Sequence, residues 1–326
     1  MTSSRLWADQ TTTAEVEKPK PAAPAKGSNA EHALAQALRE LVGSDATLTS
    51  RVEQIEAAIE QIKGQEPRTV RFAIGEKPAG PEIKNARPEL GEIVRRTAAG
   101  LNNVWLTGPA GSGKTTLAHS LADALGRPFT AQSFAADTSS AALVGMIDAH
   151  GTYRETGFIH AYETGGVFLL DEIDAAPAEI VVTLNSALAN GSLHLPRHTD
   201  PARRVIKRHA DTVIVAAANT WGLGATAQYC GRAPIDAATL DRFTGNRHAI
   251  GYDQAIERSI CPDEAVYSLV TSLRHAAETH KLRRIVGTRS VVAAAKLHAA
   301  GYGLAEILSA LTVDWTPEEK AKGGVA

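Results

Sequence analysis

The run TGPAGSGKTT, residues 107–116, limits the fold of this chain more than any other stretch. Its spacing from Gly108 through Gly113 to Lys114 and Thr115 fits the pattern G-x-x-x-x-G-K-[ST] without a gap. Glycines let such a loop curl until several backbone N–H groups point inward at phosphate oxygens, and the lysine adds a positive charge beside them. Gly, Ser and Pro also form ordinary turns, so the flanking sequence must decide between a phosphate loop and a turn.

The flanking sequence favours the phosphate loop. The apolar run NVWL, residues 103–106, precedes it and is typical of a strand. After the loop, LAHSLADAL (117–125) places leucines at helical spacing on one face. Strand, glycine-rich loop and helix in this order put a bound phosphate at a helix N-terminus. The expected nucleotide-binding residues are Gly108, Pro109, Ala110, Gly111, Ser112, Gly113, Lys114, Thr115 and Thr116.

Length and composition exclude several classes of protein. A chain of 326 residues can bury a large core without disulfides, and its two cysteines, Cys230 and Cys261, sit in no metal-ligand spacing. Two cysteines cannot form a disulfide framework, so we expect a reducing, cytoplasmic location. No apolar stretch approaches the length of a membrane span, so we expect no membrane partner. The formal net charge of −2 argues against a generally basic nucleic-acid binder.

Composition also divides the chain. Residues 1–30 are rich in Thr, Ala, Pro and Lys without apolar periodicity, which predicts a disordered tail. Residues 31–66 carry apolar positions at steps of three and four, which predicts a helical segment that is either a short coiled coil or a helix packed on its own domain. We expect an α/β nucleotide-binding domain over residues 67–252 and a helical lid over residues 253–326.

A second apolar run, GGVFLLDEID, ends in carboxylates. Strand ends of a parallel sheet face the ligand crevice, so Asp171 is expected to hold Mg²⁺ together with the Thr115 hydroxyl. Glu172 is expected to accept a proton from the attacking water. A third run, DTVIVAAANT, ends at Asn219, whose amide would either orient that water or cap the following turn; we favour the first.

Taken together, five motifs resemble the AAA+ ATPases. GPAGSGKTT, VFLLDEID, VAAANT, TLDRF and GTRS are similar to the P-loop, Walker B, sensor 1, arginine finger and sensor 2 of that family, over roughly residues 85–318. Within it, the stretch before VFLLDEID resembles the helix-2 insertion of the MoxR and magnesium-chelatase side. ANTWGLGATAQYCGRAPIDAATLDRF resembles ATPase subunits of the CobS type, including phage-encoded ones.

The resemblance implies a fold and a chemistry. The fold would be α/β, a P-loop three-layer αβα core around a parallel sheet, with a C-terminal helical lid and an N-terminal helical segment. The cofactors would be ATP and Mg²⁺, and the protein would be a homo-oligomer, a hexameric ring. Arg242 would act as a finger on the nucleotide of a neighbouring subunit, and Arg289 would reach the phosphates of its own chain. The implied catalytic residues are Glu172, Asn219, Arg242 and Arg289.

The resemblance leaves the substrate open. A protein partner remodelled by the ring, a metal chelatase served by its ATPase subunit, and a DNA-associated motor or scaffold are the three alternatives. Residues 192–212 predict a basic hairpin, which is either a nucleic-acid contact or a solvated loop. Aromatic residues of the insertion are expected to pack in the core rather than to grip a substrate. The hairpin cations are Arg197, Arg203, Arg204, Lys207 and Arg208; the aromatics are Tyr153, Phe158 and Tyr162.

Overall fold

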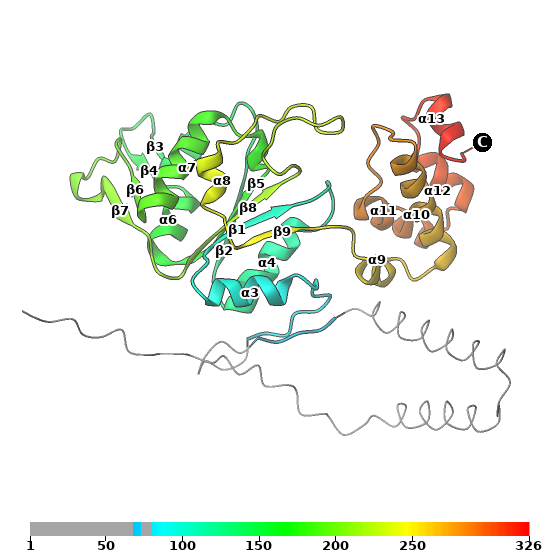
Figure 1. Cartoon of the computed structure of the whole chain (residues 1–326), viewed down its shortest axis with the longest axis horizontal. Coiled ribbons are helices and arrows are strands. Elements are labelled where there is room, and N and C mark those ends of the chain that lie inside the picture. The colour runs from blue at the N-terminus through cyan, green and yellow to red at the C-terminus, as the bar shows by residue number, and fades with distance from the viewer. Residues whose placement is uncertain (1–67, 73–79, 326) are drawn as a thin grey trace, which may run out of the picture. The chain divides into compact units, whose positions relative to one another are not determined.

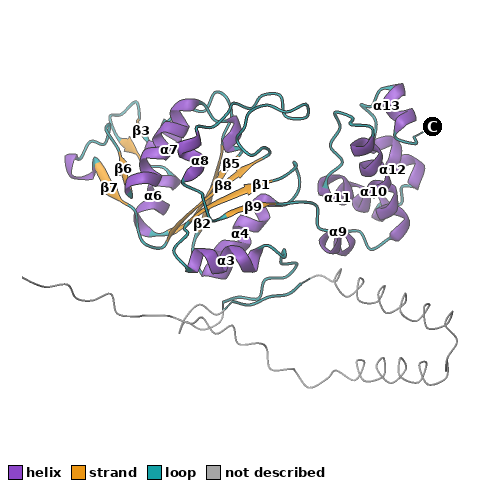
Figure 2. Cartoon of the chain, viewed as in Figure 1, coloured by secondary structure: helices purple, strands orange, loops and turns teal. Residues whose placement is uncertain are grey.

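Five short strands build one sheet, and two of its inner strands, β5 and β8, are the most apolar. The computed structural model describes residues 68–72 and 80–325, so the predicted tail and N-terminal helical segment lie outside the described residues. All neighbouring strands of the sheet are parallel, in the order β2-β5-β8-β1-β9 (Figures 1 and 2). The strands are β1 (Asn103–Thr107), β2 (Phe129–Ser133), β5 (Gly166–Asp171), β8 (Thr212–Ala218) and β9 (Arg247–Ala249).

Helices cover both faces of this sheet because its central strands are apolar on both sides. Successive strand residues point to opposite faces, so Leu106, Leu169 and Val215 pack with α3 and α4, whereas Trp105, Phe168 and Ile214 belong to the core that includes α6 and α7. The flanking helices are α3 (Leu90–Ala98), α4 (Lys114–Leu125), α6 (Gly157–Thr164), α7 (Ala178–Asn190) and α8 (Ala237–Asp241). The predicted three-layer αβα core with a parallel sheet is confirmed.

Two small hairpins extend this core. The first joins β3 (Met146–Ile147) to β4 (Tyr153–Arg154), between the short helix α5 (Ala141–Val144) and α6. Phe158 and Tyr162, which follow this hairpin, are buried in the core, and Tyr153 packs against the same cluster. These aromatic residues therefore pack in the core, as expected. The second joins β6 (Ser192–His194) to β7 (Val205–Lys207) and is the predicted basic hairpin. Two 3₁₀ turns complete this part, η1 (Ile173–Ala175) and η2 (Pro201–Arg203).

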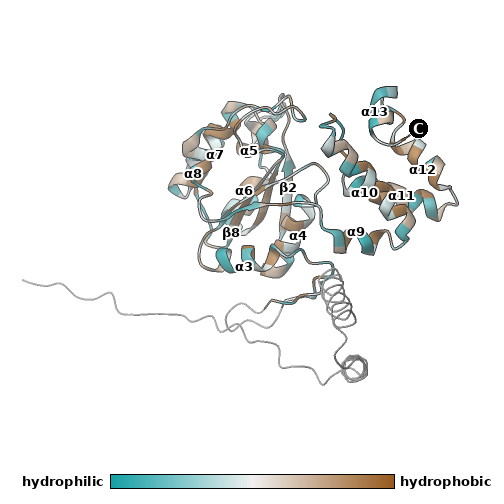
Figure 3. Ribbon diagram, turned by 45° about the vertical axis from the view of Figure 1, so that its right-hand side comes forward, coloured by the Kyte–Doolittle hydropathy of each residue, from teal (hydrophilic) through white to brown (hydrophobic). Residues whose placement is uncertain are grey.

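The C-terminal part is helical and has its own core. Buried side chains of α10, α11 and α12 meet there, among them Val270, Val291 and Ile307, and Trp315 packs with them. Figure 3 shows apolar residues along α10 and α11. The helices are α9 (Gln254–Ile260), α10 (Glu264–Thr279), α11 (Thr288–Ala299), α12 (Leu304–Leu311) and α13 (Pro317–Lys322). The predicted C-terminal helical region is therefore present.

Two further observations concern the described residues. None of their helices combines the length and the apolar character that crossing a bilayer requires. Both cysteines are free: Cys230 is exposed and Cys261 is buried.

Candidate functional site

The carboxyl ends of β1, β5 and β8 meet at one edge of the sheet. Thr107 is paired with Ala218, and Leu170 with Ala216, so each strand ends within about two residues of its neighbour's end. Parallel strands present their carboxyl ends to a common crevice. The phosphate loop, the carboxylates after β5 and Asn219 after β8 are therefore neighbours.

Two glycines are required by the path of the phosphate loop. A Cβ at Gly108 would lie 2.0 Å from the carbonyl oxygen of Ile250, so only glycine fits this approach. Gly113 precedes the first residue of α4 with φ at +87°, a left-handed conformation that other residues adopt at a cost. The loop thus turns tightly into the N-terminus of α4, where backbone N–H groups lack intrahelical acceptors.

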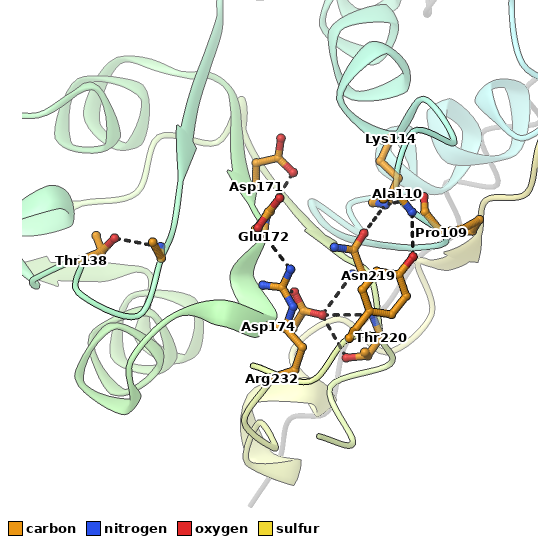
Figure 4. Close-up of polar contacts among 12 residues, drawn as sticks. Pro109, Ala110, Lys114, Thr138, Asp171, Glu172, Asp174, Asn219, Thr220 and Arg232 are labelled. Atoms are coloured by element: carbon orange, nitrogen blue, oxygen red, sulfur yellow. Dashed lines mark hydrogen bonds and ion pairs between the residues drawn. The ribbon is translucent and has the colours of Figure 1, made fainter. Parts of the chain in front are cut away.

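Lys114 lies buried at the centre of the site, with 8 % of its surface exposed. Its Nζ donates to the carbonyl oxygens of Gly108 at 2.8 Å and Pro109 at 3.1 Å and to Oδ1 of Asn219 at 2.9 Å (Figure 4). Burial lowers the pKa of the Lys114 amine to about 8, and nearby carboxylates, Asp171 foremost, oppose this shift. The amine is thus a desolvated donor beside the loop.

Thr115 and Asp171 form a second polar pair. The Thr115 hydroxyl donates to Oδ2 of Asp171 at 3.0 Å. Hydroxyl and carboxylate oxygens are ligands that Mg²⁺ accepts, and this ion normally completes its shell with water and phosphate oxygens. Across residues 68–72 and 80–325 no group of three or more His, Cys, Asp or Glu side chains could hold a metal. The pair therefore fits a Mg²⁺ that arrives with a phosphate ligand, not a cage made by protein alone.

Glu172 directly follows this pair. Its backbone adopts φ of +55°, and its side chain is 50 % exposed. It is one of three non-glycine residues with positive φ among those described, the others being Asn85 and Lys281. Such backbone conformations cost energy and occur often at functional sites. The strand end thus turns the Glu172 carboxylate out of the core toward the crevice that it lines.

A buried carboxylate holds the loop that carries Asn219. Oδ2 of Asp174 accepts from the backbone N–H groups of Asn219 and Thr220 and from the Thr220 hydroxyl, each at 3.1 Å (Figure 4). The Asp174 side chain is fully buried. Its other oxygen lies 3.6 Å from Nη1 of Arg232. Sequence reasoning passed over Asp174, although it is the second aspartate of the DEID run.

These groups line one cavity of about 630 Å³. The cavity wall continues onto α9 and α11, so the helical part closes it from one side. Arg289, the second residue of α11, lies on this wall as the sequence predicts for a residue near the phosphates. The principal residues that line the cavity are Lys84, Asn85, Arg87, Ala110 to Leu117, Asp171, Glu172, Asn219, Asp253, Ile256, Ile260, Thr288, Arg289 and Val292.

A buried ion pair fixes the start of α11. Glu257 is completely buried, and Arg274 donates to its two oxygens at 2.7 and 2.9 Å. The Thr288 hydroxyl donates to the same carboxylate at 2.7 Å. The Arg274 guanidinium also lies 4.1 Å above the ring of Tyr252. These hydrogen bonds satisfy the buried charges of Glu257 and Arg274. Because Thr288 is bonded to Glu257, the next residue, Arg289, is held in place.

Two residues missed by sequence reasoning connect the phosphate loop to its surroundings. Arg87 donates to the carbonyl oxygens of Ser112 and Gly251, both at 2.7 Å. Tyr252 donates its hydroxyl to the carbonyl oxygen of Ala110 at 3.2 Å. A lone Arg in a linker and a Tyr after a strand carry no recognisable spacing, so no sequence signal could have found them.

Arg242 lies outside the cavity wall. It ends α8, its carbonyl oxygen accepts from Nδ2 of Asn103 at 3.0 Å, and its side chain is exposed. Within the part of the chain that the structure describes, its guanidinium makes no hydrogen bond or ion pair. The structure therefore does not bring Arg242 together with the other predicted catalytic residues.

Several cations of the basic hairpin form ion pairs or hydrogen bonds with other groups of the protein. Arg203 pairs with Glu155 at 3.0 Å and with Glu163 at 2.5 Å. Arg208 donates to the carbonyl oxygens of Asn102 and Thr212, each at 3.1 Å. Arg204 donates to the carbonyl oxygen of His198, and the cations exposed without such contacts among the described residues are Arg197 and Lys207.

The α/β part of the chain is similar to a known family. Residues 103–243 match the model described as AAA domain (dynein-related subfamily), a match that covers less than half of the chain. The subunit RuvB of the Holliday junction branch migration complex of Chlorobium luteolum is 28 % identical over 120 residues, 37 % of this chain and 31 % of the relative. An uncharacterized protein of Staphylococcus epidermidis is 29 % identical over 150 residues, 43 % of this chain and 53 % of the relative. The chain thus spans a third to about half the length of these relatives.

Solved structures give a weaker likeness. NtrX from Brucella abortus has a TM-score of 0.44 at 17 % identity, covering 84 % of this chain and 61 % of the other. NtrX in complex with ADP has a TM-score of 0.40 at 17 % identity, covering 81 % and 53 % of the two chains.

The Asp174 contacts generate a stability prediction. Asp174→Asn replaces an oxygen that accepts three hydrogen bonds in a buried site and removes the partner of Arg232, so the free energy of unfolding should fall by about 2–4 kcal/mol. Urea denaturation followed by circular dichroism measures the change. Asp137→Asn, at an exposed position, should change it by less than about 0.5 kcal/mol. Equal stability of the two variants would contradict a structural role for the buried carboxylate.

Proposed function

We propose that this chain is an AAA+ ATPase that binds ATP with Mg²⁺ and hydrolyses it. The observation that carries the proposal is the convergence of Lys114, Asn219 and the Thr115–Asp171 pair in one cavity beside the phosphate loop. The match of residues 103–243 to the AAA domain supports it. The architecture, a parallel sheet between helices with a helical part beside the cavity, is the one such a site requires.

Each residue of the site has a separate role in binding or hydrolysis. Backbone N–H groups of the phosphate loop and the Lys114 amine bind and orient the phosphates. Thr115 and Asp171 would hold Mg²⁺, which neutralises charge on the phosphate oxygens when bound. Glu172 accepts the proton of the attacking water, and Asn219, fixed through its backbone by Asp174, orients that water. Arg289 adds positive charge from α11.

We extend the proposal to a ring homo-oligomer, a hexamer of the MoxR and CobS-like kind, that remodels a protein partner. The position of Arg242 supports an assembly, because its exposed side chain lies outside the cavity of its own chain and has no partner among the described residues. A guanidinium delivered to the γ-phosphate of a neighbouring subunit stabilises charge in the transition state and couples hydrolysis to assembly.

The first prediction separates binding from chemistry. Lys114→Ala should abolish ATP binding, because it removes the charge beside the phosphates. Glu172→Gln should bind ATP with the parent's affinity yet lose turnover by roughly 10²-fold or more, because only the proton acceptor is lost. Fluorescent-nucleotide titration and phosphate release measure the two properties. Turnover by Glu172→Gln at the parent's rate would contradict the assignment of the base.

The second prediction concerns pH. A bound triphosphate favours the charged amine of Lys114, whose pKa burial lowers to about 8, so binding raises that pKa. The amine is already protonated below pH 8, and affinity there should not change through Lys114. Above pH 8 affinity should fall, approaching roughly tenfold per pH unit. Titration of ATP at pH 7, 8 and 9 tests this.

A matched variant makes the pH assignment specific. Lys84→Met removes another lysine of the cavity wall, one that is exposed, and should keep the fall above pH 8. An affinity that stays constant from pH 7 to pH 9 in the parent would contradict a role for the neutralised Lys114 amine.

The third prediction concerns Arg242. Arg242→Ala should bind ATP normally and hydrolyse it roughly 10³-fold more slowly, the effect of losing such a finger. Mixing it with Lys114→Ala should restore part of the activity, because some interfaces then join an intact cavity to an intact Arg242. Steady-state ATPase assays over a range of mixing ratios measure the recovery. Activity that is absent at every ratio, while size-exclusion chromatography shows mixed assemblies, would refute action between subunits.

The alternative functions have less support. The similarity to RuvB over 120 residues favours a DNA-associated motor, but three of the five hairpin cations, Arg203, Arg204 and Arg208, have internal partners. The nucleic-acid contact stays a prediction that now depends mainly on Arg197 and Lys207. The chelatase alternative also stays a prediction, and no contact among the described residues favours it.

A further inference from the structure

The loop between β8 and α8 contacts two residues of the cavity wall, Ala110 and Glu172, from a stretch of four consecutive residues. We call Tyr229 to Arg232 the 229–232 segment. Its first residue contacts the phosphate loop, its last contacts Glu172, and between them Nη2 of Arg283, from the helical part, lies 2.7 Å from Sγ of Cys230. This segment lies within the stretch that resembles ATPase subunits of the CobS type, but outside the five motifs that supply the expected site residues.

Arg232 bridges two carboxylates after β5. Its Nη2 donates to Oε2 of Glu172 at 3.2 Å, and its Nη1 lies 3.6 Å from Oδ1 of Asp174 (Figure 4). The Arg232 side chain is 13 % exposed. The side chains of its two partners differ sharply, because that of Asp174 is fully buried and that of Glu172 is 50 % exposed. Arginine suits such a double contact because its planar fork presents several fixed donors.

The two ends of this bridge differ in burial: the hydrogen bond is to the half-exposed Glu172, and the contact with the buried Asp174 is an ion pair without a hydrogen bond. Oδ2 of Asp174 is occupied by three donors, so its buried Oδ1 has Arg232 as its counter-charge. Separating a buried charge from its partner is costly, whereas a half-exposed ion pair contributes little. Arg232 is therefore anchored on Asp174, and its contact with Glu172 is the one that can open.

Tyr229 occupies a donor of the phosphate loop. The backbone N–H of Ala110 donates to the Tyr229 hydroxyl at 2.9 Å (Figure 4). Ala110 lies between Gly108 and Gly113 and lines the cavity. An N–H has one hydrogen, so it cannot make a full hydrogen bond to the tyrosine and to a phosphate oxygen at the same time.

Both contacts compete with the chemistry proposed above. A carboxylate turned toward Arg232 is not aimed at an attacking water, and a base must lie within hydrogen-bond reach of the proton it removes. We propose that the 229–232 segment is a latch: Tyr229 restrains the phosphate loop, Arg232 is a positioning residue that restrains Glu172, and nucleotide binding opens both contacts together. This inference rests on the proposed ATPase function.

One segment carrying both contacts explains how they are coupled. A phosphate that takes the N–H of Ala110 displaces the Tyr229 hydroxyl, and Arg232 lies three residues along the same loop. Displacement of the segment then frees Glu172 at the moment when a phosphate is present. Glu172 is thereby held by Arg232 until a phosphate is bound.

The binding arm of the test uses Tyr229→Phe. Without the competing hydroxyl, ATP affinity measured with a fluorescent analogue should rise roughly 2- to 10-fold, the range of one hydrogen bond. In the protein without added nucleotide, hydrogen exchange of a peptide spanning residues 108–113 should become faster. Tyr252→Phe is the matched control: it removes a hydroxyl from the carbonyl of the same residue, which frees no N–H, so affinity should not rise.

The turnover arm uses Arg232→Lys. Lysine keeps a positive charge for Asp174 but cannot span both carboxylates, so Glu172 should be free in a larger share of the loaded enzyme and kcat should rise roughly twofold to fivefold. ATP affinity should stay equal or rise, because binding no longer has to open this contact. Arg284→Lys is the matched control, because Arg284 also bridges two carboxylates, Asp314 and Glu319, far along the chain from the site. It should leave kcat at the parent's value.

The outcomes separate the latch from the proposed function. A parent protein that hydrolyses no ATP would refute the function, while the exchange rate of residues 108–113 still decides the Tyr229 contact. Unchanged exchange and affinity in Tyr229→Phe would overturn the latch in an active enzyme. So would an unchanged or lower kcat in an Arg232→Lys protein that keeps the parent's unfolding midpoint. A rise in kcat together with weaker ATP binding would also overturn it, because removing a contact that nucleotide binding must open cannot weaken binding.

Discussion

The parallel hydrogen-bonded ladder of β5, β8 and β1 is the constraint on which the site depends. Thr107 is in register with Ala218, and Leu170 with Ala216. The three strands therefore end side by side at the same edge of the sheet. The backbone register alone therefore makes the polar residues that follow these strands neighbours. Shifting one strand by one residue would turn its side chains to the other face and disperse the site. The apolar packing on both faces fixes this register.

Features that depend on local spacing could be predicted from the sequence. The phosphate loop, the strand ending at Asp171 and the helix beginning near Arg289 are each encoded within about ten residues. The αβα layers follow from apolar strands that alternate with amphipathic helices. The site also needs β8 to lie beside β5, a non-local pairing whose register local spacing does not encode, and the fold contains it.

Contacts between distant loops could not be predicted. Arg87 reaches Gly251 across 164 positions of sequence, and Tyr229 reaches Ala110 across 119. No periodicity links such pairs, because the loops that carry them have no regular structure. The hairpin gives the converse case: its arginines form a charged run in the sequence, but Glu155 and Glu163 from another segment neutralise Arg203. Charge density along a chain is therefore a poor guide to charge density on a surface.

The described chain crosses from the α/β layers into the C-terminal helices once, after β9, through residues 250–253. At that crossing Gly251 accepts from Arg87 and Tyr252 donates to Ala110, so the hinge is bonded to the phosphate loop itself. The buried Glu257–Arg274 pair stiffens the helices just beyond it. A rotation of those helices about the crossing must therefore stretch bonds at the loop. The C-terminal helices and the phosphate loop are thus joined through the same few residues, so neither can move without loading the hydrogen bonds of this crossing.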